Sequence, residues 1–399
     1  RSFFIGTVPS GELFLTSKKD RKTMATVYIG SDHAGLELKA ALVKRLSEKG
    51  HDVHDLGPAT TESCDYPVYA KGVCGKVLAD AGNATPGDEP ASFGILVCGT
   101  GIGMSMTANH IPGIRAALCG CEFQARATRQ HNNANVLCLG ERVTVEPCIV
   151  CGKCDACRHG QYGYCEHISF TYRNGDGAMA DYVVVKEPYV YELPDYLSYE
   201  TGALIEPLSV ATHAVRRADI RLGETVLIIG AGAIGMMVAA MCRRSGAAEV
   251  IIADFSDQRL EMAKQVGATV TVNSGKEDLE QAVARLTHGK GVDKSFECVG
   301  RESCFLQAIM TLKRNGTATI IGIYEKPQIQ IPASRFVTHE IHVQGAQGYC
   351  WDFPIAIAAA RDIPLEKFIT HTFPLEQLQQ ALDTALDSKS GSIKVILKP

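Results

Sequence analysis

Apolar and polar positions along the first third of the chain alternate in a way that predicts strands and helices in turn. Short apolar runs predict strands at 26–30, 52–56, 93–98 and 136–139. Apolar residues at helical spacing predict helices at 36–49, 68–78 and 122–131, and the segment 83–90 has the composition of a loop. This succession of elements indicates a parallel sheet with helices on its faces.

The pattern changes after Val143. A cysteine-rich stretch is followed by short strand-like segments through Val190, and a second alternating strand–helix unit occupies 226–323. From about Gly345, a strand signal and two helices precede a final strand at 393–397. We therefore predict an α/β protein with two Rossmann-like parallel-sheet domains and a third, smaller piece.

These changes also predict the domain boundaries. We expect a first α/β domain at 24–143 and a Rossmann domain at 216–344. The smaller domain is expected to be split between 144–215 and 345–399, and residues 1–23 to form a disordered extension.

Composition narrows the classes of function. The chain has 399 residues, with 46% hydrophobic and 21% charged residues, as expected of a soluble globular protein. Its net charge of −4 excludes the basic surface of a non-specific nucleic-acid binder. The longest uncharged run, 226–242, is too short and too rich in glycine to span a membrane. The 15 cysteines, an odd number without an export signal, argue against a disulfide framework, so we expect a cytoplasmic protein.

Three polar loops in the first domain are candidates for ligand binding. They lie at 30–35, 98–103 and 129–135, and we expect each to follow the end of a strand, where open α/β sheets bind ligands. A glycine loop there exposes backbone N–H groups to a phosphate or an enediolate oxygen. Cys98 stands at the mouth of one loop, where a helix N-terminus favours a thiolate. Taken singly, these features are more typical of a tight turn, a buried small thiol and a surface histidine.

Five stretches together are more specific, namely GSDHAG (30–35), DYP (65–67), GILVCGTGIGMSMTANH (94–110), GIRAALC (113–119) and RQHNNANVLCLGERV (129–143). With these motifs, the domain resembles the type B ribose-5-phosphate isomerases, a family that includes galactose-6-phosphate isomerase subunits. The resemblance implies aldose–ketose isomerisation of a sugar phosphate through a cis-enediol, in a homo-oligomer.

The same resemblance implies a role for individual residues. Cys98 matches the proton-transferring base, His131 the residue that opens the sugar ring, and Thr100 a support for the thiolate. The positions that match sugar-binding residues are Asp32, His33, Gly99, Gly101, Gly103 and Asn132. Arg142 matches a phosphate-binding arginine. The family's C-terminal helix, which supplies two further arginines across a dimer interface, does not follow Val143 here.

A second candidate site is a cluster of cysteines. Cys151, Cys154, Cys157 and Cys165 have the spacing of a closed tetrahedral zinc site. Cys148 is a fifth candidate, but its position directly after a proline favours a spare thiol. A redox role for a CxxC pair is disfavoured because the expected thioredoxin-like strand is missing.

The third candidate is a dinucleotide fingerprint. A predicted strand runs into Gly230, Gly232 and Gly235 and then into an apolar helix. Asp254 ends the next strand at the spacing of the carboxylate that binds the adenine-ribose hydroxyls, which predicts NAD rather than NADP. Arg259 lies near enough to tolerate the 2′-phosphate of NADP.

These two features, together with stretches at 142–165, 202–215, 254–268 and 296–300, resemble the zinc-dependent medium-chain dehydrogenases, near the sorbitol, butanediol and threonine enzymes. The resemblance implies that the smaller domain is a truncated GroES-like domain with a zinc lobe. It also implies structural zinc on the four cysteines and a catalytic-zinc position for Glu206.

The rest of that family's catalytic zinc set is missing from the sequence. The family takes those ligands from a CGSD-like motif and a GHE motif, and neither occurs in this chain. A catalytic zinc needs about three protein ligands. We therefore predict about one zinc per chain and NAD binding, with little or no polyol oxidation. The alternatives are a fusion that only binds NAD and zinc, and a dehydrogenase completed by a partner chain.

Overall fold

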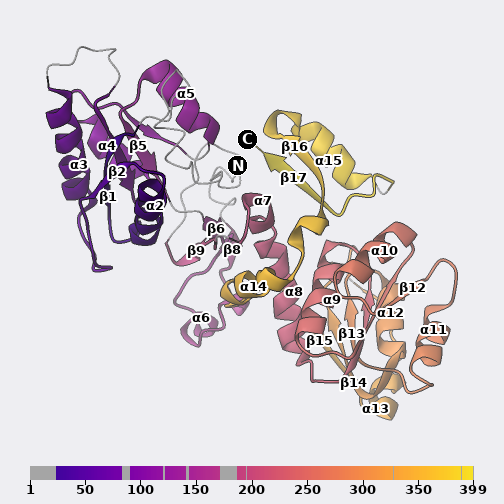
Figure 1. Ribbon diagram of the computed structural model, residues 1–399. Helices are drawn as coiled ribbons and strands as arrows, with labels where there is room; N and C mark the ends of the chain where they lie inside the picture. Colours follow the sequence, from indigo (N-terminus) through magenta and orange to yellow (C-terminus); the bar gives the residue numbers. More distant parts are fainter. Residues whose placement is uncertain are drawn as a thin grey trace. The chain divides into compact units, whose positions relative to one another are not determined.

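The computed structural model describes residues 24–82, 90–119, 122–140, 143–170, 187–194, 196–326, 328–387 and 389–398 (Figure 1). The expected extension at 1–23, most of the loop at 83–90, and Arg142 lie outside the described residues. The chain divides into two compact units between Val143 and Thr144.

The first unit contains a five-stranded sheet in the order β2-β1-β3-β5-β4, in which all neighbouring strands are parallel. The strands are β1 (Thr26–Ser31), β2 (Asp52–Asp55), β3 (Ser92–Val97), β4 (Ala116–Leu118) and β5 (Val136–Leu139). The helices are α2 (Leu36–Glu48), α3 (Tyr66–Ala81), α4 (Ile102–Asn109) and α5 (Glu122–Asn132).

The alternating side chains of these strands fill two cores, one on each face of the sheet. Leu137 and Leu139 belong to the core beneath α2 and α5, whereas Val136 and Cys138 belong to the core beneath α3 and α4. This two-sided burial explains why β3 and β5 are nearly continuous apolar runs. The predicted elements are all present, but the pattern did not reveal α4 or β4. The residues of α4 resemble a glycine loop without amphipathic spacing, and β4 has only three residues.

The second unit contains a six-stranded parallel sheet in the order β12-β11-β10-β13-β14-β15. The strands are β10 (Thr225–Ile229), β11 (Glu249–Asp254), β12 (Val270–Asn273), β13 (Val292–Glu297), β14 (Leu312–Ile320) and β15 (His342–Gly345). The helices are α9 (Ala233–Arg244), α10 (Asp257–Gln265), α11 (Leu279–Leu286), α12 (Glu302–Met310) and α13 (Ser334–His339). The strand order reverses between β10 and β13, and nucleotides bind at such a switch point.

The remainder of the second unit forms small sheets and short helices. Three two-stranded sheets pair β6 (Val143–Val145) with β9 (Val190–Glu192), β7 (Cys148–Ile149) with β8 (Ser169–Phe170), and β16 (Ile369–Pro374) with β17 (Lys394–Lys398). The helices are α6 (Asp155–Arg158), α7 (Tyr199–Gly202), α8 (Ile205–Ala218), α14 (Phe353–Ala359) and α15 (Leu378–Leu386).

The two segments expected to form one split domain meet through side chains. Cys148 and Leu193 share a hydrophobic core with Phe353 and with the strands of the Rossmann sheet. The Tyr196 hydroxyl donates a hydrogen bond to the Ile357 carbonyl at 3.0 Å. In the part of the chain that the structure describes, no sheet joins 144–215 to 345–398.

Candidate functional site

Three loops of the first unit meet at the carboxyl edge of its sheet. They follow β1, β3 and β5, so the third begins at Gly140 and is not the predicted loop at 129–135. The Asp32 N–H donates to the Val97 carbonyl at 3.1 Å, which ties the first loop to the second. A side chain on Gly35 would lie 2.8 Å from that same carbonyl oxygen, and one on Gly140 would lie 2.6 Å from the Thr100 carbonyl carbon. Only glycine allows the three loops to approach this closely.

Cys98 is buried directly after β3, and its sulfur is held by the backbone. The Gly101 N–H donates to Cys98 Sγ at 3.1 Å, just before α4 begins. Gly101 has a φ of +72°, a conformation that glycine adopts without strain. The exposed Thr100 hydroxyl instead accepts from the Ile102 N–H at 3.3 Å. A backbone amide therefore donates to the sulfur, and the support of the thiolate by the Thr100 hydroxyl stays a prediction.

Asp32 and His33 are oriented by the backbone around them. One carboxylate oxygen of Asp32 accepts from the N–H groups of Ala34 at 3.0 Å and Gly35 at 2.9 Å. His33 Nδ1 accepts from the Cys64 N–H at 3.3 Å. In a neutral ring, that bond leaves the proton on Nε2, so His33 would present a donor to a ligand.

His131 and Asn132 lie elsewhere, which corrects our expectation that residues 129–135 follow a strand. They end α5 and precede β5, whose first residue pairs with Gly94 in β3. Because α5 runs back against the parallel strands, its end lies at their amino edge. Cys98 lies at the carboxyl edge, roughly 15 Å away at about 3.3 Å per strand residue. The structure thus does not bring His131 to the Cys98 of the same chain.

The dinucleotide turn of the second unit has the backbone geometry that calls for glycine at Gly230 and Gly235. Gly230 has a φ of +101°, and a side chain on Gly235 would overlap the Gly230 carbonyl oxygen. A Cβ on Gly232, which precedes α9, would meet nothing within 4 Å. The turn, the close helix packing and an open approach for a pyrophosphate are therefore all present.

Asp254 ends β11 beside this turn. Its two carboxylate oxygens accept from the N–H groups of Ala231 at 2.8 Å and Ser256 at 2.9 Å. Each oxygen keeps a lone pair for a ribose hydroxyl. Arg259 lies on the neighbouring α10, and its guanidinium donates to the Ser392 carbonyl at 3.4 Å.

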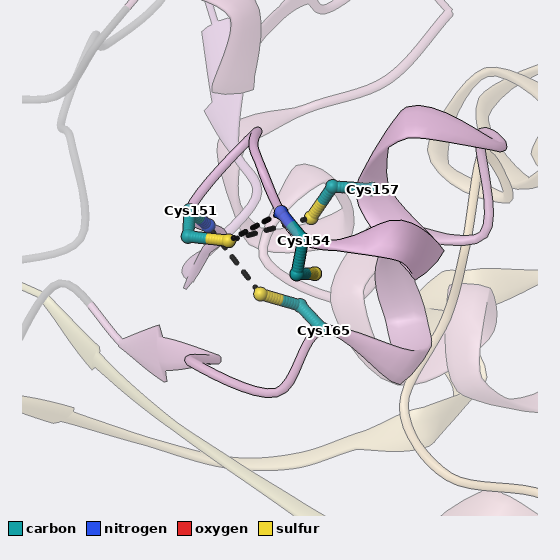
Figure 2. A group of neighbouring side chains, drawn as sticks. All are labelled: Cys151, Cys154, Cys157 and Cys165. Carbon is teal, nitrogen blue, oxygen red and sulfur yellow. Dashed lines mark hydrogen bonds between the residues drawn. The ribbon is translucent and has the colours of Figure 1, made fainter.

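The four cysteines of the predicted metal site converge around α6. Their sulfur atoms all lie within 4.8 Å of one another, and Figure 2 shows the side chains directed toward a common centre. Cys151 and Cys157 are 4.0 Å apart between sulfurs. A tetrahedron with Zn–S distances of about 2.3 Å has edges of about 3.8 Å, so this group fits zinc closely.

Backbone N–H groups lower the pKa of two of these cysteines, which favours the thiolates that bind a cation. The N–H groups of Lys153 and Cys154 lower the pKa of Cys151 to about 6, and the backbone near Cys157 lowers that of Cys154. Desolvation and the neighbouring sulfurs raise the pKa of Cys157 to about 12. Four thiolates at this separation repel one another unless a cation lies between them.

Glu206 in the first turn of α8 has no comparable partners. Burial raises its pKa, and Lys394 opposes that rise. Among the described residues, the four-cysteine group is the only set of three or more metal-ligating side chains close enough to share an ion. The residues that the structure describes therefore do not form a catalytic zinc site at Glu206.

Sequence reasoning missed several buried polar residues of the second unit. The thiol of Cys148, which we expected to be a spare, is buried and donates to the Tyr349 hydroxyl at 3.4 Å. Glu146 is buried beside it and accepts from Tyr191 at 3.0 Å. Glu297 is fully buried at the end of β13, within the FECVG stretch at 296–300. That stretch contributed only to the family resemblance, since no local signal distinguishes a buried carboxylate from an exposed one.

No helix in the described ranges is long and apolar enough to cross a membrane.

Comparison with known proteins finds a family match in each unit. The ribose/galactose isomerase family matches residues 27–150, and the zinc-binding dehydrogenase family matches residues 233–361. Sorbitol dehydrogenase of Bacillus subtilis is 34% identical over 264 residues, which cover 65% of this chain and 75% of that protein. L-Arabinitol 4-dehydrogenase of Aureobasidium melanogenum is 37% identical over 286 residues, which cover 70% of this chain and 77% of that protein.

Solved structures resemble the second unit as well. A Sinorhizobium meliloti protein described as a zinc-binding dehydrogenase bound to NADP has a TM-score of 0.62 and 28% identity, and the match covers 65% of this chain and 77% of that chain. The family matches and the relatives agree with the motifs of both units. The chain therefore belongs to the zinc-binding dehydrogenase family, near its polyol dehydrogenases, and carries a ribose/galactose isomerase domain in front of it.

Proposed function

We propose that the first unit isomerises a sugar phosphate of the ribose 5-phosphate type to its ketose. The observation that carries the proposal is the buried Cys98 thiol, which accepts the Gly101 N–H at the end of β3. This hydrogen bond holds the sulfur at the start of the loop, and a cysteine thiolate placed there can act as the base. Backbone N–H groups of such a glycine loop are suited to the enediolate oxygen.

In this proposal, His131 first transfers the proton that opens the sugar ring. The Cys98 thiolate then removes the proton at C2, and the electron pair moves into a C1–C2 enediolate. The thiol returns that proton to C1 while the oxygen protons shift from O2 to O1, so no oxidant or reductant is consumed. Asp32 and His33, which lie on the adjacent loop, bind the open chain.

The separation of His131 from Cys98 supports an oligomer with shared sites. Because the two residues lie at opposite edges of one sheet, a site with both needs the His131 of a second copy. A two-fold dimer would form two such sites. Arg142, which we expect to bind the phosphate, lies outside the described residues.

The test is formation of ribulose 5-phosphate from ribose 5-phosphate. Cys98→Ala is expected to lose about 100-fold or more in kcat, a typical contribution of a general base. Cys74→Ala, which removes another buried thiol of the unit, serves as control. Mixing Cys98→Ala with His131→Ala should restore about a quarter of the activity if dimers exchange subunits. Equal activity of Cys98→Ala and the wild type would refute the assignment.

For the second unit, we propose binding of NAD and of one structural zinc, with little or no polyol oxidation. The intact turn at Gly230, Gly232 and Gly235, together with Asp254, supports NAD over NADP. The four cysteines support the zinc. When bound, a structural zinc supplies cross-linking of the lobe, and the site keeps no open position for substrate.

Titration with NAD and NADP, elemental analysis, and NADH formation from sorbitol and L-arabinitol test this proposal together. We expect tighter binding of NAD, about one zinc per chain, and no substantial turnover. Robust turnover, or two tightly held zinc ions, would overturn the proposal. That result would mean that a partner chain completes the dehydrogenase.

A further inference from the structure

Glu297 is a buried carboxylate, and none of the described residues forms a salt bridge with it. It ends β13, and its side chain is 0% exposed. One oxygen accepts from the N–H groups of Val299 and Gly300, each at 2.8 Å. The other accepts from the Tyr324 hydroxyl at 2.9 Å. All three donors are uncharged, so the negative charge is hydrogen-bonded but not neutralised.

These bonds link the two loops that follow β13 and β14. The Glu297 carbonyl also accepts from the N–H groups of Ile321 at 2.9 Å and Gly322 at 3.0 Å. A side chain on Gly322 would lie 2.5 Å from a Glu297 carboxylate oxygen, so the second loop lies directly against the buried charge. Burial, and then Glu297, raise the pKa of Tyr324, which keeps its hydroxyl protonated as a donor.

The same loops border the nicotinamide half of the proposed cofactor site. In that site, Asp254 at the end of β11 would bind the adenosine ribose, and the turn before α9 would bind the pyrophosphate. The cofactor crosses the switch point from there toward β13 and β14. Val299 is in contact with the fingerprint turn, since a side chain on Gly230 would lie 2.7 Å from its Cγ2. Val299 and Ile323 are nevertheless 42% and 92% exposed, which leaves an apolar surface on both loops for a ring to cover.

We propose that Glu297 is a positioning and specificity-determining residue that makes this site prefer the oxidised cofactor. The inference rests on the NAD binding proposed above. The nicotinamide ring is cationic in NAD⁺ and neutral in NADH, whereas the rest of the molecule is the same. A fixed negative charge behind the loops therefore stabilises NAD⁺ selectively, and the low dielectric of the interior strengthens the effect. A carboxylate that only held the loops in place would affect both forms equally.

The experiment measures dissociation constants of NAD⁺ and NADH for the full-length protein and for Glu297→Gln. Glutamine keeps the shape and an oxygen for the two backbone amides, and its NH₂ group can donate to the Tyr324 oxygen. We expect the ratio of the NAD⁺ to the NADH dissociation constant to rise at least about fivefold. A fivefold change shifts the two-electron potential of the bound couple by about 20 mV. Glu249→Gln, at the opposite end of β11, removes an exposed charge of the same kind and should leave the ratio unchanged.

A second variant keeps the proposal testable if Glu297→Gln does not fold. Tyr324→Phe removes one donor but leaves the charge, so its preference for NAD⁺ should persist or increase. A fivefold shift of Tyr324→Phe toward NADH would overturn the proposal. So would an equal loss of both forms, or an unchanged ratio, in a folded Glu297→Gln protein. If the wild type binds neither NAD⁺ nor NADH, the proposed NAD binding is wrong. If the wild type binds both forms but Glu297→Gln does not change their ratio, only the role of Glu297 is wrong.

Discussion

Gly101 is the residue of the first unit whose backbone geometry and chemistry are most closely linked. Its φ of +72° disfavours any L side chain by roughly 1–2 kcal/mol. A Cβ there would overlap Leu118 Cδ1 and lie 2.9 Å from the Leu139 carbonyl carbon. Such overpacking costs about 1–3 kcal/mol more. We therefore expect Gly101→Ala to destabilise the unit by about 3 kcal/mol.

That loss is large enough to measure by calorimetry. At about 2.1 cal/mol/K per residue over roughly 120 residues, 3 kcal/mol lowers the melting temperature by roughly 12 °C. The single tryptophan, Trp351, lies in the second unit, so its fluorescence transition should not move. Displacing the Gly101 N–H also removes the donor to Cys98 Sγ. A hydrogen bond to a charged group is worth about 1.5–3 kcal/mol, so kcat of the isomerase should fall at least about tenfold.

Gly99 provides the matched control within the same loop. A Cβ on Gly99 would meet only Ala34 Cβ at 3.6 Å, an ordinary contact, and its φ is not left-handed. Gly99→Ala should remain within about 1 kcal/mol of the wild type. If both variants melt together, and Gly101→Ala retains its isomerase activity, then the link between this turn and the thiol is wrong.

Three further predictions concern the second unit. Cys154→Ser should reduce the zinc content from about one per chain to none by elemental analysis, whereas Cys64→Ser should not, because Cys64 lies outside the four-cysteine group. Folding lowers the pKa of Cys151 to about 6, so the stabilisation from its thiolate is present above the unfolded pKa and is lost as the pH falls through about 6. Because protons compete with zinc for the thiolates, a chromogenic chelator should detect faster zinc release as the pH falls, and release at a rate independent of pH would contradict the assignment. Gly235→Ala should weaken NAD binding at least about 100-fold, because its Cβ would overlap the Gly230 carbonyl oxygen. Gly345→Ala should bind NAD normally, because its Cβ would meet nothing within 4 Å. Equal affinities of the two variants in calorimetric titration would refute this account.

Features that depend on short stretches of chain could be predicted without a structure. The glycine turn at 230–235 and the cysteines of 151–165 have the expected local geometry, because backbone conformation and ligand spacing are fixed within a few residues of each other. Strands β3 and β5 of the first sheet and β10 and β11 of the second followed from short apolar runs for the same reason. Absence of the two catalytic-zinc motifs was also visible without a structure.

Which of these local features share a site became evident from the folded chain alone. The motif at 129–135 carries the right residues, but the direction of α5 places them at the amino edge of the sheet, away from Cys98. Likewise, Glu297 and Tyr324 are 27 residues apart, and they meet because β13 and β14 are neighbours in the sheet. Strand order and direction are set by the packing of the whole unit, and a pattern of apolar and polar residues does not encode them.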